Sequence, residues 1–152
     1  MKFIKFNFTK ISASKSENFT PDVSLNNSID ILKIEKEDIP NENNFKAIKV
    51  FFTFSVGYNK IEPKEKEDSN KANQIGEVLL EGKIVFASPN EEAENLISSW
   101  NKKEIPLSVK VPLFNLILKK CASKALELED TLNLPPHIPL PSIKIQDEKG
   151  NK

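Results

Sequence analysis

Hydrophobic residues at every second position constrain this chain more strongly than any other feature of its sequence. The clearest case lies between residues 48 and 56, where one side of the segment is apolar throughout: Ile48, Val50, Phe52, Phe54 and Val56. Successive side chains of a strand point to opposite sides, so this alternation predicts a β-strand with one buried face. Phe51 is the one large apolar residue on the otherwise polar side.

Three further segments alternate in the same way and predict three more strands. They cover residues 3–11, 23–34 and 75–87. In the segment 23–34 the alternation changes phase at Leu32 and Ile34, which indicates a β-bulge. The inward side of the last segment is predicted to carry Val78, Leu80, Ile84 and Phe86.

The first strand has apolar residues at both odd and even positions. Ile4, Phe6 and Phe8 are predicted to share one face, and Phe3 and Ile11 are predicted on the other. Because a strand has a strict period of two, this assignment leaves apolar side chains on both of its faces.

The pattern then changes to the period of a helix. Ser88 precedes Pro89 and Glu91, an arrangement typical of a helix start in which Ser88 is the N-cap and Glu91 closes a capping box. One apolar stripe follows at helical spacing: Ala93, Leu96, Ile97 and Trp100.

A second, longer helix is predicted from about Ser108 to Leu132. A wide part of its surface is apolar: Leu113, Phe114, Ile117, Leu118, Cys121, Ala125, Leu128 and Leu132. One sheet face cannot cover so wide a surface, which favours an oligomer interface or a binding groove, with a well-filled monomeric core as the alternative. The proline-rich segment 134–141 that follows is predicted to be extended and laid against the protein.

Four strands followed by two helices predict an α+β fold, a four-stranded antiparallel sheet with both helices packed on one face. Residues 1–146 are expected to form a single domain and residues 147–152 a polar tail. The stretches 39–44 and 59–73 are predicted to be a turn and a solvated hairpin loop.

Composition argues against several classes of function. The net charge is zero and every basic residue is Lys, so the chain lacks the Arg side chains that bind phosphates and guanine edges, and a nucleic-acid partner is not expected. No run approaches the ~18 apolar residues of a membrane span, so a membrane partner is not expected either. A lone cysteine, Cys121, cannot form an internal disulfide, and the N-terminus lacks the apolar core of a signal peptide, so a cytoplasmic location is expected.

No catalytic residues, metal ligands or cofactor site can be identified from the sequence, and the chain is not expected to be an enzyme. His137, the only histidine, lies in the proline-rich segment without a nucleophile pattern around it and is interpreted as an exposed or packing residue. Cys121 lies on the apolar stripe of the long helix, where a free cysteine acts as a small hydrophobe. The glycines are isolated and form no phosphate-binding loop.

Four stretches resemble the SecB family of export chaperones: residues 45–56, 76–86 and 111–125, and the leucine-proline segment 132–136. The resemblance implies a SecB-like sheet followed by two helices. It also implies a homotetramer, built as a dimer of dimers, that holds unfolded polypeptides in apolar grooves without ATP and takes part in protein transport.

The first functional hypothesis is therefore a SecB-like, ATP-independent chaperone whose partner is an unfolded polypeptide and which forms a dimer or tetramer. Its predicted peptide-binding residues are Phe51, Leu134, Ile138 and Leu140. The second hypothesis is a structural or protein–protein interaction subunit with the same fold, in which this surface binds one fixed partner or a second copy. The third is a small-molecule enzyme whose site cannot be read from the sequence.

Overall fold

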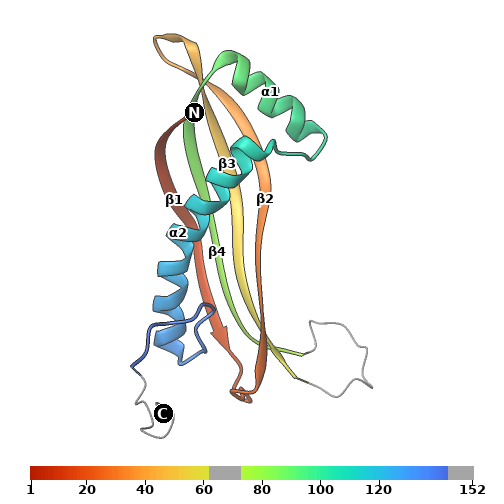
Figure 1. Cartoon of the computed structure of the whole chain (residues 1–152), viewed down its shortest axis with the longest axis vertical. Helices are drawn as coiled ribbons and strands as arrows, with labels where there is room; N and C mark the ends of the chain where they lie inside the picture. Colours follow the sequence, from red (N-terminus) through yellow and green to blue (C-terminus); the bar gives the residue numbers. More distant parts are fainter. Residues whose placement is uncertain (62–72, 144–152) are drawn as a thin grey trace, which may run out of the picture.

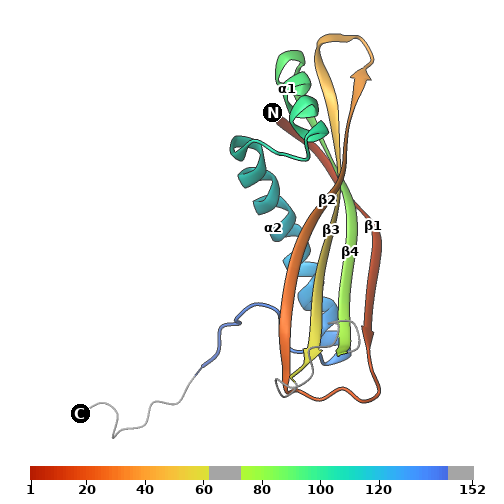
Figure 2. The same ribbon diagram turned by 90° about the vertical axis from the view of Figure 1, so that its right-hand side faces the viewer.

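The structure is a computed structural model that describes residues 1–61 and 73–143. Its elements follow the predicted order: β1 (Lys2–Lys15), β2 (Val23–Ile39), β3 (Glu42–Lys60), β4 (Gln74–Pro89), α1 (Asn90–Asn101) and α2 (Leu107–Leu132). The strands form one long antiparallel sheet, and both helices lie on the same face of it (Figures 1 and 2). The predicted α+β class is confirmed. Most of the predicted loop 59–73, and the tail from residue 147, fall outside the described residues.

The strand order in the sheet is β1-β4-β3-β2, which the sequence analysis did not predict. The strands β1 and β2 follow one another in the chain yet form opposite edges of the sheet. The segment that joins them crosses below the ends of the other strands (Figure 2). Between β2 and β3 the turn is tight, and Asn41 has a φ of 63°, in the left-handed region that asparagine tolerates. The turn predicted within 39–44 is therefore confirmed at Pro40 and Asn41, whereas residues 42–44 already belong to β3.

β-Bulges set which side chains of the edge strands face the helices. In β2 the register shifts between Ile31 and Lys33, as the phase change predicted, and Leu32 is left 54% exposed. Residues directly opposite one another in an antiparallel ladder share a face, so Ile29 and Ile31 lie on the helix side with β3.

The predicted faces of β1 are wrong in part, because this strand contains two register shifts. Each extra residue reverses the alternation beyond it. As a result Phe3 lies opposite Phe86 and Ile11 opposite Leu80, on the same face as Phe6 and Phe8. Ile4 is passed over by the first shift and is 50% exposed.

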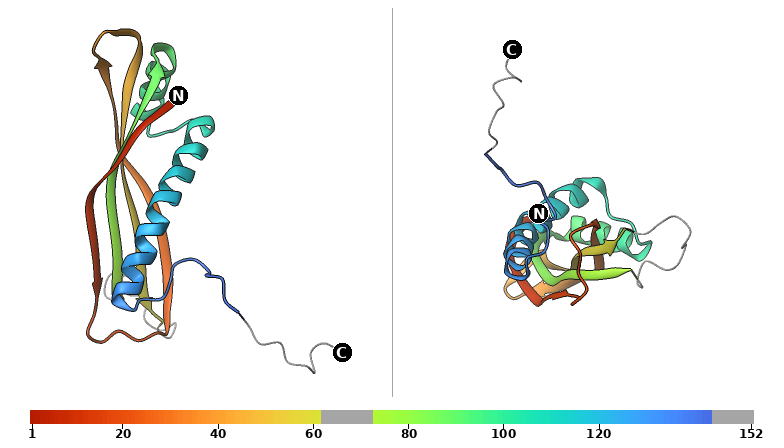
Figure 3. Two further views of the ribbon diagram at one scale, coloured as in Figure 1. Left: turned by 90° about the vertical axis from the view of Figure 1, so that its left-hand side faces the viewer. Right: turned by 90° about the horizontal axis from the view of Figure 1, so that it is seen from below.

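The core lies between the helix face of the sheet and the two helices. The alternating residues of β3 and β4 predicted to face inward are buried there, except Phe86, which is partly buried and packs against the core. The helix α1 contributes Ala93 and Leu96. The α2 residues that complete the core are Leu113, Ile117, Cys121 and Ala125. Seen from below, both helices lie on one side of the sheet, and no helix of the described residues lies on the other side (Figure 3).

The predicted helix start at Ser88 is wrong. Ser88 pairs with Lys46 in the ladder between β3 and β4, so its backbone belongs to the sheet. Pro89 occupies the N-cap position of α1, and no side chain forms a capping hydrogen bond there. The hydroxyl of Ser88 is buried and donates to the Pro89 carbonyl at 3.3 Å. The long helix begins at Leu107 and ends at Leu132, close to the prediction.

Candidate functional site

The helix α2 crosses the sheet at an angle. It therefore leaves part of the sheet face that carries the helices uncovered. The lower half of this helix lies over β1 and β4, whereas β2 forms the opposite edge of the sheet (Figure 1). At the end of α2, Asn133 adopts the left-handed conformation, and the Leu134 amide donates to the Glu129 carbonyl at 2.8 Å. This helix C-cap turns the chain back toward the sheet.

A largely apolar cavity of about 470 Å³ opens between α2, β2 and the segment after α2. We call it the α2–β2 groove. Its lining residues come from β2, β3, α2 and the segment after α2, and include no Lys, Asp or Glu: Asn27, Ser28, Ile29, Phe54, Phe114, Leu118, Ala122, His137 and Ile138. Among these lining residues, Phe54 is almost completely buried at the base of the groove, whereas Leu118 is 45% exposed. The groove therefore offers solvent-accessible apolar surface in a concave setting.

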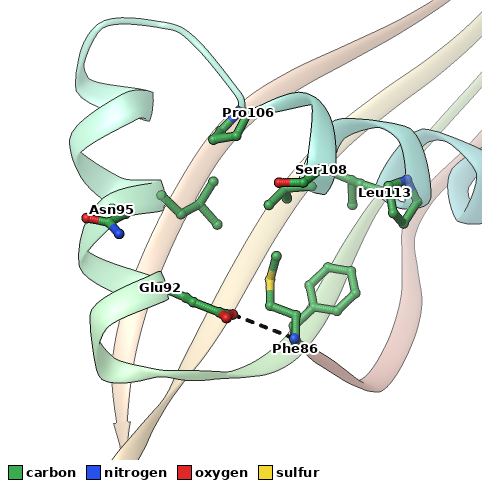
Figure 4. Close-up of a pocket in the computed structure, with 10 residues that line it drawn as sticks. Phe86, Glu92, Asn95, Pro106, Ser108 and Leu113 are labelled. Carbon is green, nitrogen blue, oxygen red and sulfur yellow. Dashed lines mark ion pairs between the residues drawn. The ribbon is translucent and has the colours of Figure 1, made fainter.

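A second cavity, of about 550 Å³, lies between α1, the start of α2 and the first residue of the chain (Figure 4). Phe86 and Leu113 contribute apolar walls, and Asn95 and Ser108 contribute polar groups. The N-terminal amino group lies 3.8 Å from a carboxylate oxygen of Glu92, and this ion pair spans the space in the close-up. Because this cavity is lined by charged as well as apolar groups, the α2–β2 groove is the better candidate for binding apolar side chains.

A buried polar cluster lies at one end of the groove and consists of Tyr58, Glu129 and His137. We call it the Glu129 cluster. Glu129 Oε1 lies 2.8 Å from His137 Nδ1 and 3.3 Å from the backbone nitrogen of His137. The Tyr58 hydroxyl contacts Glu129 Oε2 and lies 2.7 Å from the Pro135 carbonyl oxygen, so its single hydrogen is shared between two acceptors.

Burial dominates the electrostatics of this cluster. Both the His137 and Glu129 side chains are at most 3% exposed. Desolvation, together with the neighbouring Glu129 carboxyl group, raises the pKa of Tyr58 well above its usual range, so the phenol remains a hydrogen-bond donor. The His137 ring also packs edge-to-face on Phe54, with ring centroids 5.7 Å apart. The cluster is therefore in direct contact with the base of the α2–β2 groove.

Burial also determines the ionisation state of the single thiol of the chain. Cys121 is free and completely buried on α2, as the interpretation of its position on the apolar stripe predicted. Desolvation raises its pKa to about 12, which keeps it a neutral thiol. A buried thiol of this kind packs as a small hydrophobe.

The structure does not bring the four predicted peptide-binding residues together. Ile138 lines the groove and Leu140 lies two residues further along, 54% exposed. Leu134 is 5% exposed and belongs to the core. Phe51 lies on the opposite face of the sheet, where Lys33 Nζ is 5.6 Å from the centre of its ring. Peptide contact by these four residues stays a prediction.

The sequence analysis missed Glu129 and Tyr58, although both have a signal in the sequence. Glu129 continues the four-residue spacing of the buried α2 side chains, Leu113, Ile117, Cys121 and Ala125. Tyr58 continues the inward alternation of β3. A polar residue in line with buried apolar residues needs a buried partner, and these two residues supply partners for one another.

The described part of the chain contains neither a group of metal ligands nor a helix that could span a membrane. Among residues 1–61 and 73–143, no three His, Cys, Asp or Glu side chains are grouped in a way that could hold a metal ion. Neither helix described here is long and apolar enough to cross a membrane.

Comparisons with known proteins gave one structural similarity. No family model matches the chain, and no curated protein sequence matches it. The fold is similar to that of a SecB-like chaperone from Mycobacterium tuberculosis, solved in complex with a ChAD peptide from an antitoxin. The two share 12% sequence identity with a TM-score of 0.47, over 95% of this chain and 92% of that one.

Proposed function

We propose that this protein binds apolar segments of other polypeptides in the α2–β2 groove and holds them without ATP, as a SecB-like chaperone would. One observation carries the proposal: a concave surface with Phe54 at its base and Leu118 on its wall is open to solvent and has no Lys, Asp or Glu in its lining. Concave, mostly apolar surfaces with a few polar groups are where proteins most often bind apolar groups.

The size of the groove suits side chains of a polypeptide. An apolar cavity of roughly 150 Å³ holds a benzene molecule, and the groove offers about 470 Å³. It can therefore accept more than one large apolar side chain. Each fully buried Leu or Phe side chain contributes about 1.5–3 kcal/mol, and ordering the bound segment offsets much of this gain. We expect weak, reversible binding of each segment and little dependence on its detailed sequence.

The alternative is a structural or interaction subunit with the same fold and no role in holding unfolded chains. The outer surface of α2 favours this reading, because Leu107 and Val111 are 74% and 54% exposed and do not line the groove. These residues could contact a second copy or one fixed partner. Sedimentation at micromolar concentration tests self-association: Leu107→Ser should shift a dimer or tetramer toward the monomer, and a parent protein that is monomeric at all concentrations excludes it.

The proposed function is tested by binding to a permanently unfolded protein, reduced and carboxymethylated α-lactalbumin, and by suppression of aggregation of a heat-denatured test protein. Leu118→Ser removes an exposed groove side chain at little cost to the fold. Losing roughly half of a leucine's burial, about 1 kcal/mol, should weaken binding about fivefold.

Val111→Ser is the matched control, since Val111 is an exposed apolar residue of the same helix outside the groove. It should bind the unfolded protein as the parent does. No binding by the parent, or equal loss in both variants, contradicts the proposal.

A further inference from the structure

The polar contacts that attach the segment forming one wall of the groove come mainly from the Glu129 carboxylate and the Tyr58 hydroxyl. Glu129 is hydrogen-bonded to both the ring and the backbone nitrogen of His137. Tyr58, its other partner, lies within hydrogen-bond distance of the carbonyl of Pro135. Three of the contacts of the Glu129 cluster therefore lead into the segment that follows α2, and none of them is needed to form the helix itself.

Beyond His137 the segment has no other polar attachment. From Ile138 to Ile143 no hydrogen bond joins it to the rest of the described chain, and Leu140 is 54% exposed. Pro135, Pro136 and Pro139 fix the backbone φ angle on either side of His137. Since the neighbouring residues are conformationally restricted, the position of His137 determines where the side chain of Ile138 points.

A buried carboxyl group is a costly way to stabilise a fold. Replacing buried ionic groups by apolar ones of similar size is often neutral or stabilising, whereas removing one partner leaves the other unsatisfied. A leucine in place of Glu129 would extend the apolar stripe of α2 and still bury its side chain. What it would not supply is the fixed direction of hydrogen bonds to His137. The cluster therefore contributes position rather than stability.

We infer that Glu129 is a positioning residue for the α2–β2 groove: it holds His137 and Ile138 in place as a preformed wall against which a bound apolar segment packs. The inference rests on the proposed function and adds to it a residue that does not itself line the groove. A wall fixed before binding lowers the entropic cost of association, since the segment is not ordered by the ligand.

The opposite arrangement predicts the opposite change in affinity for the bound polypeptide. If the segment were instead a strap that blocks the groove and must leave before a polypeptide enters, releasing it from Glu129 would strengthen binding. The position of Ile138 at the edge of the lining, 38% exposed and leaving the cavity open, favours a wall.

The test compares Glu129→Leu with Glu127→Leu, which makes the same substitution at an exposed position of the same helix. Binding of reduced and carboxymethylated α-lactalbumin should weaken about tenfold in Glu129→Leu, the cost of ordering a segment with one or two large side chains. Glu127→Leu should bind as the parent does. Glu129→Gln, whose amide oxygen can still accept from both His137 nitrogens, should keep affinity within about twofold of the parent.

Two readouts separate positioning from a general loss of structure. His137 is the only histidine, so its ring signals are resolved in a nuclear magnetic resonance spectrum without assignment. In the parent, the ring N–H facing Glu129 should exchange slowly with solvent. In Glu129→Leu it should exchange fast while unfolding stays cooperative and the melting temperature falls only as far as the loss of a buried hydrogen-bond partner explains.

A measurement on the unmodified protein serves if Glu129→Leu does not fold. Saturating the parent with the unfolded protein should leave the exchange of the His137 ring N–H slow, because a wall stays in place when the groove fills. Faster exchange on binding, or tighter binding by Glu129→Leu, overturns the inference in favour of a strap. If Leu118→Ser weakens binding and Glu129→Leu does not, the inference fails and the proposed function stands; if the parent does not bind, both fail.

Discussion

Two phenylalanines close together on β3 lie in opposite environments. Phe51 points away from the helices and lies between Lys33 and Lys83 in the sheet. Phe54 points toward the helices and lies at the base of the α2–β2 groove. On the outer face the phenylalanine ring thus lies beside a lysine ammonium group, whereas on the helix face it is enclosed by apolar residues. An apolar residue becomes a candidate binding site through the shape and charge of its surroundings, more than through its own exposure.

The two sheet faces differ in the same way as the two phenylalanines. On the Phe51 face, Lys49 forms an ion pair with Glu37 and lowers the pKa of that carboxyl group. The hydroxyls of Ser28 and Ser55 lie 2.8 Å apart, also on this face. The ion pair is open to solvent and contributes little to stability, whereas the serine pair is half-buried between the two strands. The apolar groove lies on the other face, where burial drives folding and would also drive binding.

The largest effect is expected from Phe54→Ala. Removing a fully buried phenylalanine ring should lower the free energy of unfolding by about 3–5 kcal/mol, through lost burial and the cavity left behind. The ring also packs against His137, so the His137 signals should broaden or move. Chemical denaturation measures the loss; a change below about 1 kcal/mol would mean that this ring is not part of the core.

Tyr58→Phe should have the next largest effect. It removes the hydroxyl that contacts both Glu129 and Pro135 and leaves a buried carboxyl oxygen without that partner. An unsatisfied buried polar group costs about 1–3 kcal/mol. Denaturation measures this cost, and protease resistance of the segment after α2 should fall with it. Parent-like stability would show that the Glu129 cluster does not form in solution.

Raising the pH to about 10 should produce a loss of comparable size, about 2 kcal/mol, through Cys121. Burial raises the pKa of its thiol to about 12, whereas in the unfolded chain it ionises near its ordinary value of about 8.5. The stabilisation is therefore complete below that ordinary value and is lost as the pH rises toward 12, by about 1.4 kcal/mol per pH unit. The difference in stability between the parent and Cys121→Ala should depend on pH in this range, and a constant difference would contradict the burial of this thiol.

The sequence predicted the regular elements of the core better than its edges. The predicted alternation of inward and outward side chains is observed in β3 and β4, because both are central strands with a partner on each side. The edge strand β1 contains two bulges. Its apolar residues at both odd and even positions show no phase change of the kind that predicted the β2 bulge, so nothing in the pattern marks Ile4 as the residue that is passed over. The strand order also depends on β1 pairing with β4, a contact between distant parts of the chain that periodicity does not encode.

The candidate site was predicted only in part, for a related reason. Ile138 was selected from its own segment and does line the groove. Leu118 and Phe54 were seen as members of apolar stripes, which do not show where one element stops covering another. Glu129 and Tyr58 become partners only when α2 lies across the end of β3. The site is formed by contacts between residues that are far apart in the sequence. Each residue taken alone fits the local pattern of its own helix or strand, so the sequence does not mark it as part of a site.

A small effect is expected from Phe51→Ala, the counterpart of Phe54→Ala on the other face. The ring is half-buried and contacts Lys33, an interaction of about 0.5–1 kcal/mol at exposed sites. The loss of stability should be about 1 kcal/mol or less, and binding of the unfolded protein should not change if the groove is the binding site. Lost binding with retained stability would restore Phe51 as a peptide contact and move the candidate site to the outer face.

The smallest effect is expected from salt on the affinity for the unfolded protein. This measurement tests the comparison between the two faces of the sheet. The groove lining includes no Lys, Asp or Glu, and the net charge of the chain is zero, so neither local ion pairs nor long-range attraction should contribute to binding there. Between about 0.01 M and 0.15 M salt the screening length falls from roughly 30 Å to 8 Å, which weakens any binding that depends on exposed charges.

Affinity for reduced and carboxymethylated α-lactalbumin, an acidic unfolded chain, should therefore change by less than about twofold over this range. The same titration with Leu118→Ser serves as the control, since it should lower affinity equally at both salt concentrations. A tenfold weakening with salt would instead indicate contacts with lysines, and the outer face offers these in Lys33, Lys49 and Lys83 around Phe51. Salt dependence thus decides which of the two phenylalanines lies at the binding surface, without altering a residue of either face.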